Sequence, residues 1–209
     1  MKQILAFGDS LTWGASPGGG RHPFEDRWTS VVEAALSGVR VIAEGLPGRT
    51  TAFDDPLAEV DRNGSRVLPI LLGSHDPLDL VIVMLGTNEL KGHICGKAAG
   101  SAEGIEKILE IVAGFSYCEA HAAPGAMIIS PPHFRNPALP KVLTNRRDIE
   151  ESLKLAPFYK AIADRRGCLF FDAATVAEAS PIHGVHLNAE NTRAIGATIA
   201  KFLKETDRL

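Results

Sequence analysis

Ester hydrolysis needs a nucleophile, a base that later acts as an acid, and hydrogen-bond donors for the oxyanion. The sequence offers a residue of a suitable type for each role. Ser10 lies shortly after one apolar run, Asn88 lies shortly after another, and His186 precedes the last expected helix. Gly45 can present an unobstructed backbone N–H. Each residue alone is typical of a turn or a solvated loop, so the functional interpretation depends on their order and spacing together.

Short apolar runs alternate with stretches of helical spacing, and these are the elements that must position the four residues. The runs are continuously apolar, which predicts strands buried on both faces of a parallel sheet. Ser101 is the expected N-cap of the third helix, and Pro157 is the expected point of any break in the fourth. The expected strands are 4–7, 39–43, 80–85, 126–130 and 169–171, and the expected helices are 28–36, 64–72, 101–120, 147–166 and 189–204.

Ligands of such sheets bind beyond the carboxyl ends of the strands. Ser10, Gly45 and Asn88 follow the first three strands, so we expect them at one rim of the sheet. Three long segments without helical spacing are expected to be substrate-binding loops. They are residues 15–23, 91–100 and 131–145.

Length and composition indicate an ordinary globular protein. The chain has 209 residues, 45% of them hydrophobic, and a formal net charge of -3. These values predict a single domain over residues 1–209. The near balance of charge does not favour a nucleic-acid partner, and we expect the pairs Arg146-Arg147 and Arg165-Arg166 on solvated helix faces.

Cysteine usage and hydropathy predict a cytoplasmic location. The three cysteines, an odd number without close pairing, do not suggest a disulfide framework. The apolar run at the N-terminus is too short for a signal peptide, and no stretch approaches the roughly 20 apolar residues that span a bilayer. We therefore expect no membrane association.

The chemistry-bearing segments together resemble the GDSL, or SGNH, hydrolase family. Residues 7–14 (Phe-Gly-Asp-Ser-Leu-Thr-Trp-Gly) are similar to the nucleophile motif of that family, and Gly45, Asn88 and His186 match its glycine, asparagine and histidine positions in the same order. The resemblance extends from the first expected strand to the last helix. Trp13 and the run 184–193 are similar to the arylesterase and acyltransferase branch.

The resemblance implies a flavodoxin-like α/β/α fold with a five-stranded parallel sheet. It also implies that Ser10 attacks the ester carbonyl, that His186 moves the proton, and that the backbone N–H groups of Ser10 and Gly45 with the Asn88 side chain form the oxyanion hole. Short acyl or aryl esters, including acetylated carbohydrates, are the implied substrates, with acyl transfer to another alcohol as a further reaction. Members of this branch often form homo-oligomers, and no cofactor is expected.

One position departs from the family pattern. The family has an aspartate three residues before the histidine, and this chain has His183 there. Such an aspartate fixes the tautomer of the histidine and stabilises its cationic form. A neutral His183 can still accept a hydrogen bond from His186, but it cannot supply negative charge.

Three interpretations of His183 remain open. The enzyme works with His183 as a neutral orienting group and is attenuated, or another carboxylate compensates, or His183 is a substitution introduced to impair or retune the enzyme. The carboxylates near enough in sequence are Asp172, Glu178 and Glu190, although a strand-end or helix-supporting role suits them better.

The same residues allow alternatives to ester hydrolysis. A catalytically silent sugar- or ester-binding protein is the alternative from another class, and thioesters or lysophospholipids are alternative substrates. Zinc ligation by the pairs His183–His186 and His93–Cys95 is disfavoured because the pairs fall on different loops, so we expect no metal. Trp13 is a candidate for substrate contact, whereas residues 131–137 would cap the cleft or form an oligomer contact, and Cys95 is expected to be a free loop thiol.

Overall fold

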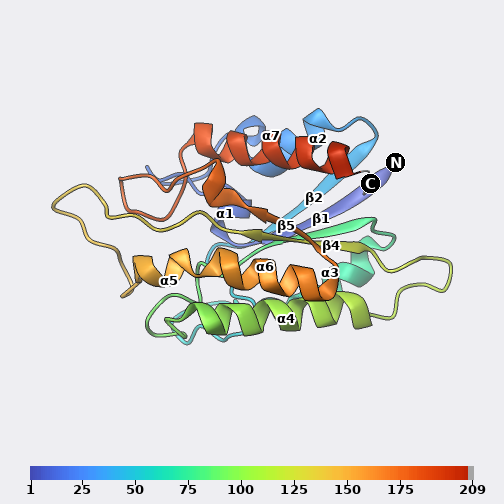
Figure 1. Ribbon diagram of the computed structural model, residues 1–209, viewed down its shortest axis with the longest axis horizontal. Coiled ribbons are helices and arrows are strands. Elements are labelled where there is room, and N and C mark those ends of the chain that lie inside the picture. The colour runs from blue at the N-terminus through green and yellow to red at the C-terminus, as the bar shows by residue number, and fades with distance from the viewer. Residues whose placement is uncertain (207–209) are drawn as a thin grey trace.

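The computed structural model describes residues 1–206, and its centre is a five-stranded, entirely parallel sheet (Figure 1). The order of the strands is β2-β1-β3-β4-β5. The first strand is therefore an inner strand: β2 lies on one side of it, and β3, β4 and β5 are added in turn on the other side. The strands are β1 (Lys2–Gly8), β2 (Val39–Gly45), β3 (Leu80–Met84), β4 (Gly125–Ser130) and β5 (Leu169–Asp172). The continuous apolar runs explain this arrangement, because every residue of β3 is buried on one face or the other.

Helices cover both faces of the sheet (Figure 1). On one face α2 (Trp28–Ala35) and α7 (Ala189–Thr206) pack together, with Trp28 and Ile195 buried against the sheet. On the other face lie α3 (Gly64–His75), α4 (Ala98–Gly114) and α6 (Leu155–Arg166), which bury Leu68 and Tyr159 among others. The prediction of a three-layer α/β/α fold is therefore confirmed.

The largest differences from the expected helix bounds are in the third and the fourth expected helix. The third begins at Ala98 and ends at Gly114, so Ser101 is not an N-cap. Ser101 lies within the helix, and its buried hydroxyl donates to the carbonyl of Gly86 at 3.2 Å. The backbone N–H of Ala98 instead donates to Glu151, which lies 53 residues away in the sequence, a partner that local capping rules do not reveal.

The stretch 147–166 forms two helices rather than one. α5 (Ile149–Leu153) and α6 are separated at Lys154, and Pro157 lies in the first turn of α6, where a missing N–H is tolerated. The shorter elements are α1 (Ser10–Trp13) and two 3-10 turns, Phe24–Asp26 and Ala173–Thr175. Among residues 1–206, no helix combines the length and the apolar character needed to cross a membrane.

Candidate active site

Ser10 lies where the first strand turns into the first helix. β1 ends at Gly8 and α1 begins at Ser10, and between them the buried Asp9 accepts a hydrogen bond from the backbone N–H of Leu11 at 2.9 Å. This cap fixes the turn and directs the serine toward the rim of the sheet. The Oγ of Ser10 lies 3.0 Å from Nε2 of His186, a hydrogen-bond distance across 176 residues of sequence.

His186 has a second histidine as its other partner. Its Nδ1 lies 3.0 Å from Nε2 of His183, and the two rings stand nearly perpendicular, at 88°, with their centroids 4.6 Å apart. The position that the resemblance assigns to an aspartate thus holds a ring that reaches the same nitrogen. Ser10, His186 and His183 form one hydrogen-bonded chain.

A tight turn presents both histidines. Gly184 has φ +78°, and its N–H donates to the carbonyl of Ser180 at 2.9 Å. A Cβ at this glycine would lie 2.1 Å from the carbonyl oxygen of Arg135, so only glycine fits between the two segments. The N–H of Ser180 in turn donates to the carbonyl of His186 at 2.8 Å. The turn is therefore held from both sides of the histidine pair.

The site disfavours protonation of His186. Burial lowers its pKa to about 4, and the neighbouring His183, Arg147 and His22 act in the same direction. Burial also lowers the pKa of His183. Both rings are therefore neutral at neutral pH, which leaves Nε2 of His186 able to accept a proton from Ser10.

The three carboxylates considered as substitutes for the missing aspartate are engaged elsewhere or do not reach His186. Asp172 accepts from the backbone N–H of Ala174 at 3.0 Å and caps a 3-10 turn. Glu178 pairs with Arg135 at 3.0 Å. Neither these two nor Glu190 is a hydrogen-bond partner of His186 within residues 1–206.

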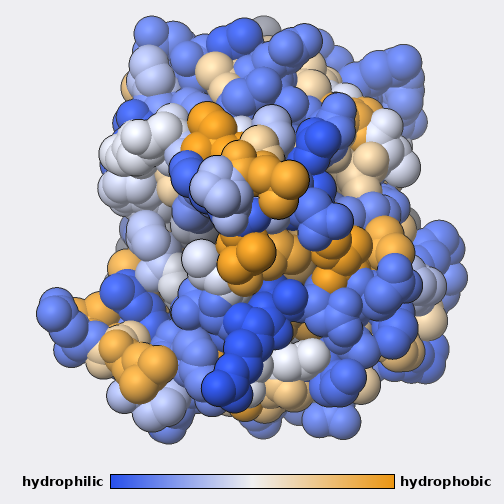
Figure 2. Space-filling model, turned by 90° about the vertical axis from the view of Figure 1, so that its left-hand side faces the viewer, coloured by the Kyte–Doolittle hydropathy of each residue, from blue (hydrophilic) through white to orange (hydrophobic). Residues whose placement is uncertain are grey.

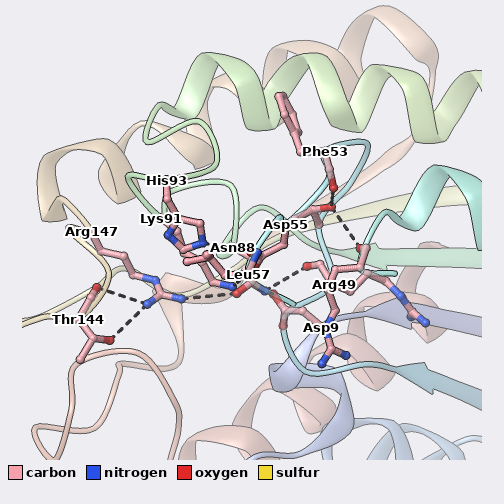
Figure 3. Close-up of polar contacts among 12 residues, drawn as sticks. Asp9, Arg49, Phe53, Asp55, Leu57, Asn88, Lys91, His93, Thr144 and Arg147 are labelled. Carbon is pink, nitrogen blue, oxygen red and sulfur yellow. Dashed lines mark hydrogen bonds and ion pairs between the residues drawn. The ribbon is translucent and has the colours of Figure 1, made fainter. Parts of the chain in front are cut away.

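Asn88 is held by polar contacts on several sides (Figure 3). Its Nδ2 donates to the carbonyl of Arg49 at 3.0 Å and to a carboxylate oxygen of Asp9 at 3.3 Å, and its Oδ1 lies 3.5 Å from Arg147. Burial raises the pKa of Asp9 to about 7, against the stabilising hydrogen bond from Leu11. The amide is thus oriented by fixed neighbours beside the serine turn.

Gly45 and Trp13 meet at the edge of the site. Gly45 ends β2, and a Cβ at this position would lie 2.2 Å from the backbone nitrogen of Trp13, so the close approach of α1 to β2 requires glycine. Gly45 itself does not line the cavity described next, whereas Trp13 does. The guanidinium of Arg21 lies 4.9 Å from the Trp13 ring and is positioned to hold it by a cation–π contact.

An open cavity of about 480 Å³ lies over the serine. Each of the three long loops contributes to its wall, through Ala15, Lys91 and the pair Thr144–Asn145. Residues 131–137 do not line it, and Phe134 is buried in the core instead. Figure 2 shows this end of the molecule, with apolar side chains set among hydrophilic ones. The lining residues are Ser10, Trp13, Ala15, Pro47, Gly48, Asn88, Lys91, Thr144, Asn145, Arg147, His183, Val185 and His186.

Arg147 is a site residue that the sequence interpretation missed. We expected it on a solvated helix face, but it precedes α5, is half-buried and lines the cavity. The loop before α5 carries its guanidinium over the ring of Phe134, 5.7 Å from the ring centroid. Arg146 is exposed but lies in a turn rather than on a helix face, and Arg165 and Arg166 on α6 pair with Glu106.

The second pair of possible metal ligands is separate from the histidine pair. His93 contacts Asp55 at 3.2 Å, and Cys95 contacts the carbonyl of Lys97 at 3.8 Å. The described residues contain no group of three or more His, Cys, Asp or Glu side chains that would suit a metal ion.

Comparison with known proteins agrees with the geometry. The profile of the GDSL-like lipase/acylhydrolase family matches residues 6–194. A candidate arylesterase from Agrobacterium tumefaciens strain C58 is 47% identical, with a TM-score of 0.94 over 98% of this chain and 99% of the other. A carbohydrate acetylesterase family member from Sinorhizobium meliloti is 46% identical, with a TM-score of 0.93 over the whole of both chains.

A more distant solved structure, the aryl esterase of M. smegmatis, is 33% identical, with a TM-score of 0.87 over 98% of this chain and 99% of that one. No curated protein sequence matches the chain. The family match covers most of the sequence and the fold agrees throughout. On these grounds the chain belongs to the GDSL-like lipase/acylhydrolase family, and it is an ester hydrolase by that membership.

Proposed function

We propose that the protein hydrolyses short-chain carboxylic esters through an acyl-enzyme on Ser10. The observation that carries this proposal is the hydrogen-bonded chain Ser10–His186–His183 in the floor of an open cavity. In the first step the Oγ of Ser10 attacks the carbonyl while its proton passes to Nε2 of His186. His186 then gives this proton to the departing alcohol, and water resolves the acyl-enzyme by the reverse sequence.

The oxyanion is proposed to be stabilised by the backbone N–H groups of Ser10 and Gly45 and by the amide of Asn88. Asn88 lines the cavity beside Ser10, and its Nδ2 would exchange the longer of its two contacts, with Asp9 at 3.3 Å, for the oxyanion, while the contact with the carbonyl of Arg49 keeps the amide oriented. One removed donor of this kind typically costs about 10²- to 10³-fold in turnover.

His183 is proposed to orient His186 without stabilising the imidazolium. Loss of the negative charge from a triad costs about 10⁴-fold in turnover in an unrelated serine protease, with geometry preserved. We therefore expect a slow esterase rather than an inactive one. The proton transfer from Ser10 remains possible, because the low pKa of His186 leaves its ring neutral above pH 4.

Acetyl esters are the proposed substrates, including acetylated carbohydrates and aryl acetates. This part follows from what the similar structures are described as acting on. The cavity of about 480 Å³ is large enough for a small ester with a ring-sized alcohol. Another alcohol in place of water would give acyl transfer, and a thioester would react by the same steps.

The test is hydrolysis of p-nitrophenyl acetate together with labelling by a fluorophosphonate. We expect measurable turnover, a covalent adduct on the peptide that contains Ser10, and loss of both in Ser10→Ala. Circular dichroism and thermal melting show whether the variant retains the fold. A folded protein that neither turns over the ester nor labels at Ser10 would overturn the enzyme proposal. The silent binding protein would then be the better interpretation, because His183 in place of the aspartate is the feature that favours it.

A further inference from the structure

Arg147 is a cation in the wall of the cavity, and within residues 1–206 it forms no ion pair with a carboxylate. The nearest acceptors of its guanidinium are the carbonyl and hydroxyl of Thr144 and Oδ1 of Asn88, all at 3.5 Å, the outer limit of a hydrogen bond (Figure 3). Its Nε is buried and has no hydrogen-bond partner among the described residues. A guanidinium has five N–H donors in a planar fork, so most of its hydrogen-bonding capacity is unused here.

The other charges around the cavity do not balance Arg147. Lys91 is the second cation in the wall, but Asp55 neutralises it at 2.8 Å. The cavity wall contains no aspartate or glutamate. Asp9 lies behind Asn88, which separates it from Arg147, and burial raises its pKa to about 7, so it is only partly ionised at neutral pH. The cavity therefore has a net positive charge at Arg147.

Arg147 lines the same cavity as Ser10 and His186, so the departing alcohol and this charge share one space. Its positive charge lowers the pKa of both His186 and His183, so it lies within electrostatic reach of the two rings. His186 must lie next to the oxygen of the departing alcohol in order to protonate it. The proposed acyl group is an acetyl group, which carries no charge, so an anionic group of the substrate that meets Arg147 in this cavity belongs to the alcohol.

We propose that Arg147 binds a carboxylate on the alcohol part of the ester, so that the preferred substrates are acyl esters of hydroxy acids. This inference rests on the proposed function and adds the chemical class of the alcohol. A carboxylate matches the planar guanidinium fork and can accept two parallel hydrogen bonds. It would also supply the counter-charge that the cavity wall lacks.

The test compares two substrates of the same shape, 4-acetoxybenzoate and 4-acetoxybenzamide. They differ in charge at the para position and have the same acetyl group. We expect kcat/KM for the benzoate to exceed that for the benzamide, and Arg147→Gln to lower this ratio about 10- to 100-fold, the range of a charge-assisted hydrogen bond. Arg147→Lys keeps the charge without the fork and should give an intermediate ratio.

Arg146→Gln is the matched control, because it removes the same charge from an exposed neighbour outside the cavity. We expect it to leave the ratio unchanged. Equal proportional losses on both substrates in Arg147→Gln would instead indicate a role in orienting Asn88 and would overturn the proposal. A ratio that is already close to one in the parent protein would also overturn it.

Binding of the product separates this inference from the proposed function. Calorimetric titration with 4-hydroxybenzoate and with 4-hydroxybenzamide needs no turnover. Tighter binding of the benzoate, lost in Arg147→Gln, supports the inference even if the protein hydrolyses no ester. Hydrolysis of p-nitrophenyl acetate without any such preference supports the proposed function and refutes the role of Arg147.

Discussion

Replacement of His183 by aspartate should raise the activity and move the pH profile. At neutral pH the parent places two neutral rings together, with centroids 4.6 Å apart. A carboxylate charge at that separation from an imidazolium contributes about 3.6 kcal/mol at an effective dielectric constant of about 20. This attraction exists only after His186 has taken the proton from Ser10. Applied fully to the transition state, it corresponds to a rise of about 400-fold in kcat/KM.

The same charge should raise the pKa of His186 from about 4 toward the ordinary range of histidine. The acid limb of kcat/KM reports the pKa of the base in the free enzyme. In the parent, the acid limb should therefore lie below the ordinary pKa of histidine, because burial lowers the pKa of both rings, and in His183→Asp it should move to higher pH. An increase in rate and an upward move of the acid limb are expected together, because both have the same electrostatic cause.

The assay is hydrolysis of p-nitrophenyl acetate at fixed pH values between 4 and 8, held by a pH-stat. The released p-nitrophenol is measured in quenched samples that are all brought to the same pH. His183→Asn is the matched control, since it has the size of aspartate without the charge. Aspartate is shorter than histidine, so His183→Glu tests whether a longer carboxylate reaches Nδ1 better. If the asparagine variant gains as much as the aspartate variant, or if neither carboxylate changes the rate or the limb, charge at this position does not limit catalysis.

Two further predictions concern stability. Asp9 has a pKa raised to about 7 by burial, above its unfolded value near 3.8, so the folded state retains a proton that the unfolded chain releases, and stability falls as pH rises from about 3.8 to about 7. The difference in Tm between Asp9→Asn and the parent should therefore increase by at least about 3 °C from pH 5 to pH 8, and no change in that difference would contradict the assignment. Glu151 accepts from the N–H of Ala98 at 2.9 Å and from Lys154, so Glu151→Ala should lower the free energy of unfolding by about 2 kcal/mol and Tm by about 4–8 °C. Glu150→Ala, at an exposed neighbour, should change Tm by less than about 2 °C, and equal effects of the two substitutions would refute the role of the Glu151 contacts.

The sheet and the main site positions could be predicted because they depend on local patterns. Strands that are continuously apolar, such as β3, can only be satisfied between two helical layers. The corner at Ser10 lies at the carboxyl end of a strand, and the turn that carries His186 lies just before α7. These patterns define both elements. Their meeting at 3.0 Å therefore follows from the order of elements and from the family motifs.

The features that were missed depend on contacts between distant segments. The start of α4 at Ala98 is set by Glu151 on α5, not by a nearby cap. Arg147 looked like half of a solvated basic pair, because nothing in the neighbouring residues reveals that the loop before α5 passes over Phe134 into the cavity wall. Both contacts depend on the path of segment 131–148, which carries Arg147 and leads into α5. This segment has no hydrophobic periodicity from which its path could be predicted.

The histidine pair also restricts where protons can reside. If Nε2 of His186 is to accept from Ser10, its Nδ1 must carry a hydrogen, and Nε2 of His183 must offer a lone pair. A proton added to His183 would place two donors face to face, and the contact could be restored only by the tautomer of His186 that cannot act as a base. A carboxylate at this position presents lone pairs alone and has no such conflict. A single proton on His183, a ring that takes no part in the bond-making steps, would therefore silence the serine, and the burial that lowers the pKa of His183 keeps that proton away.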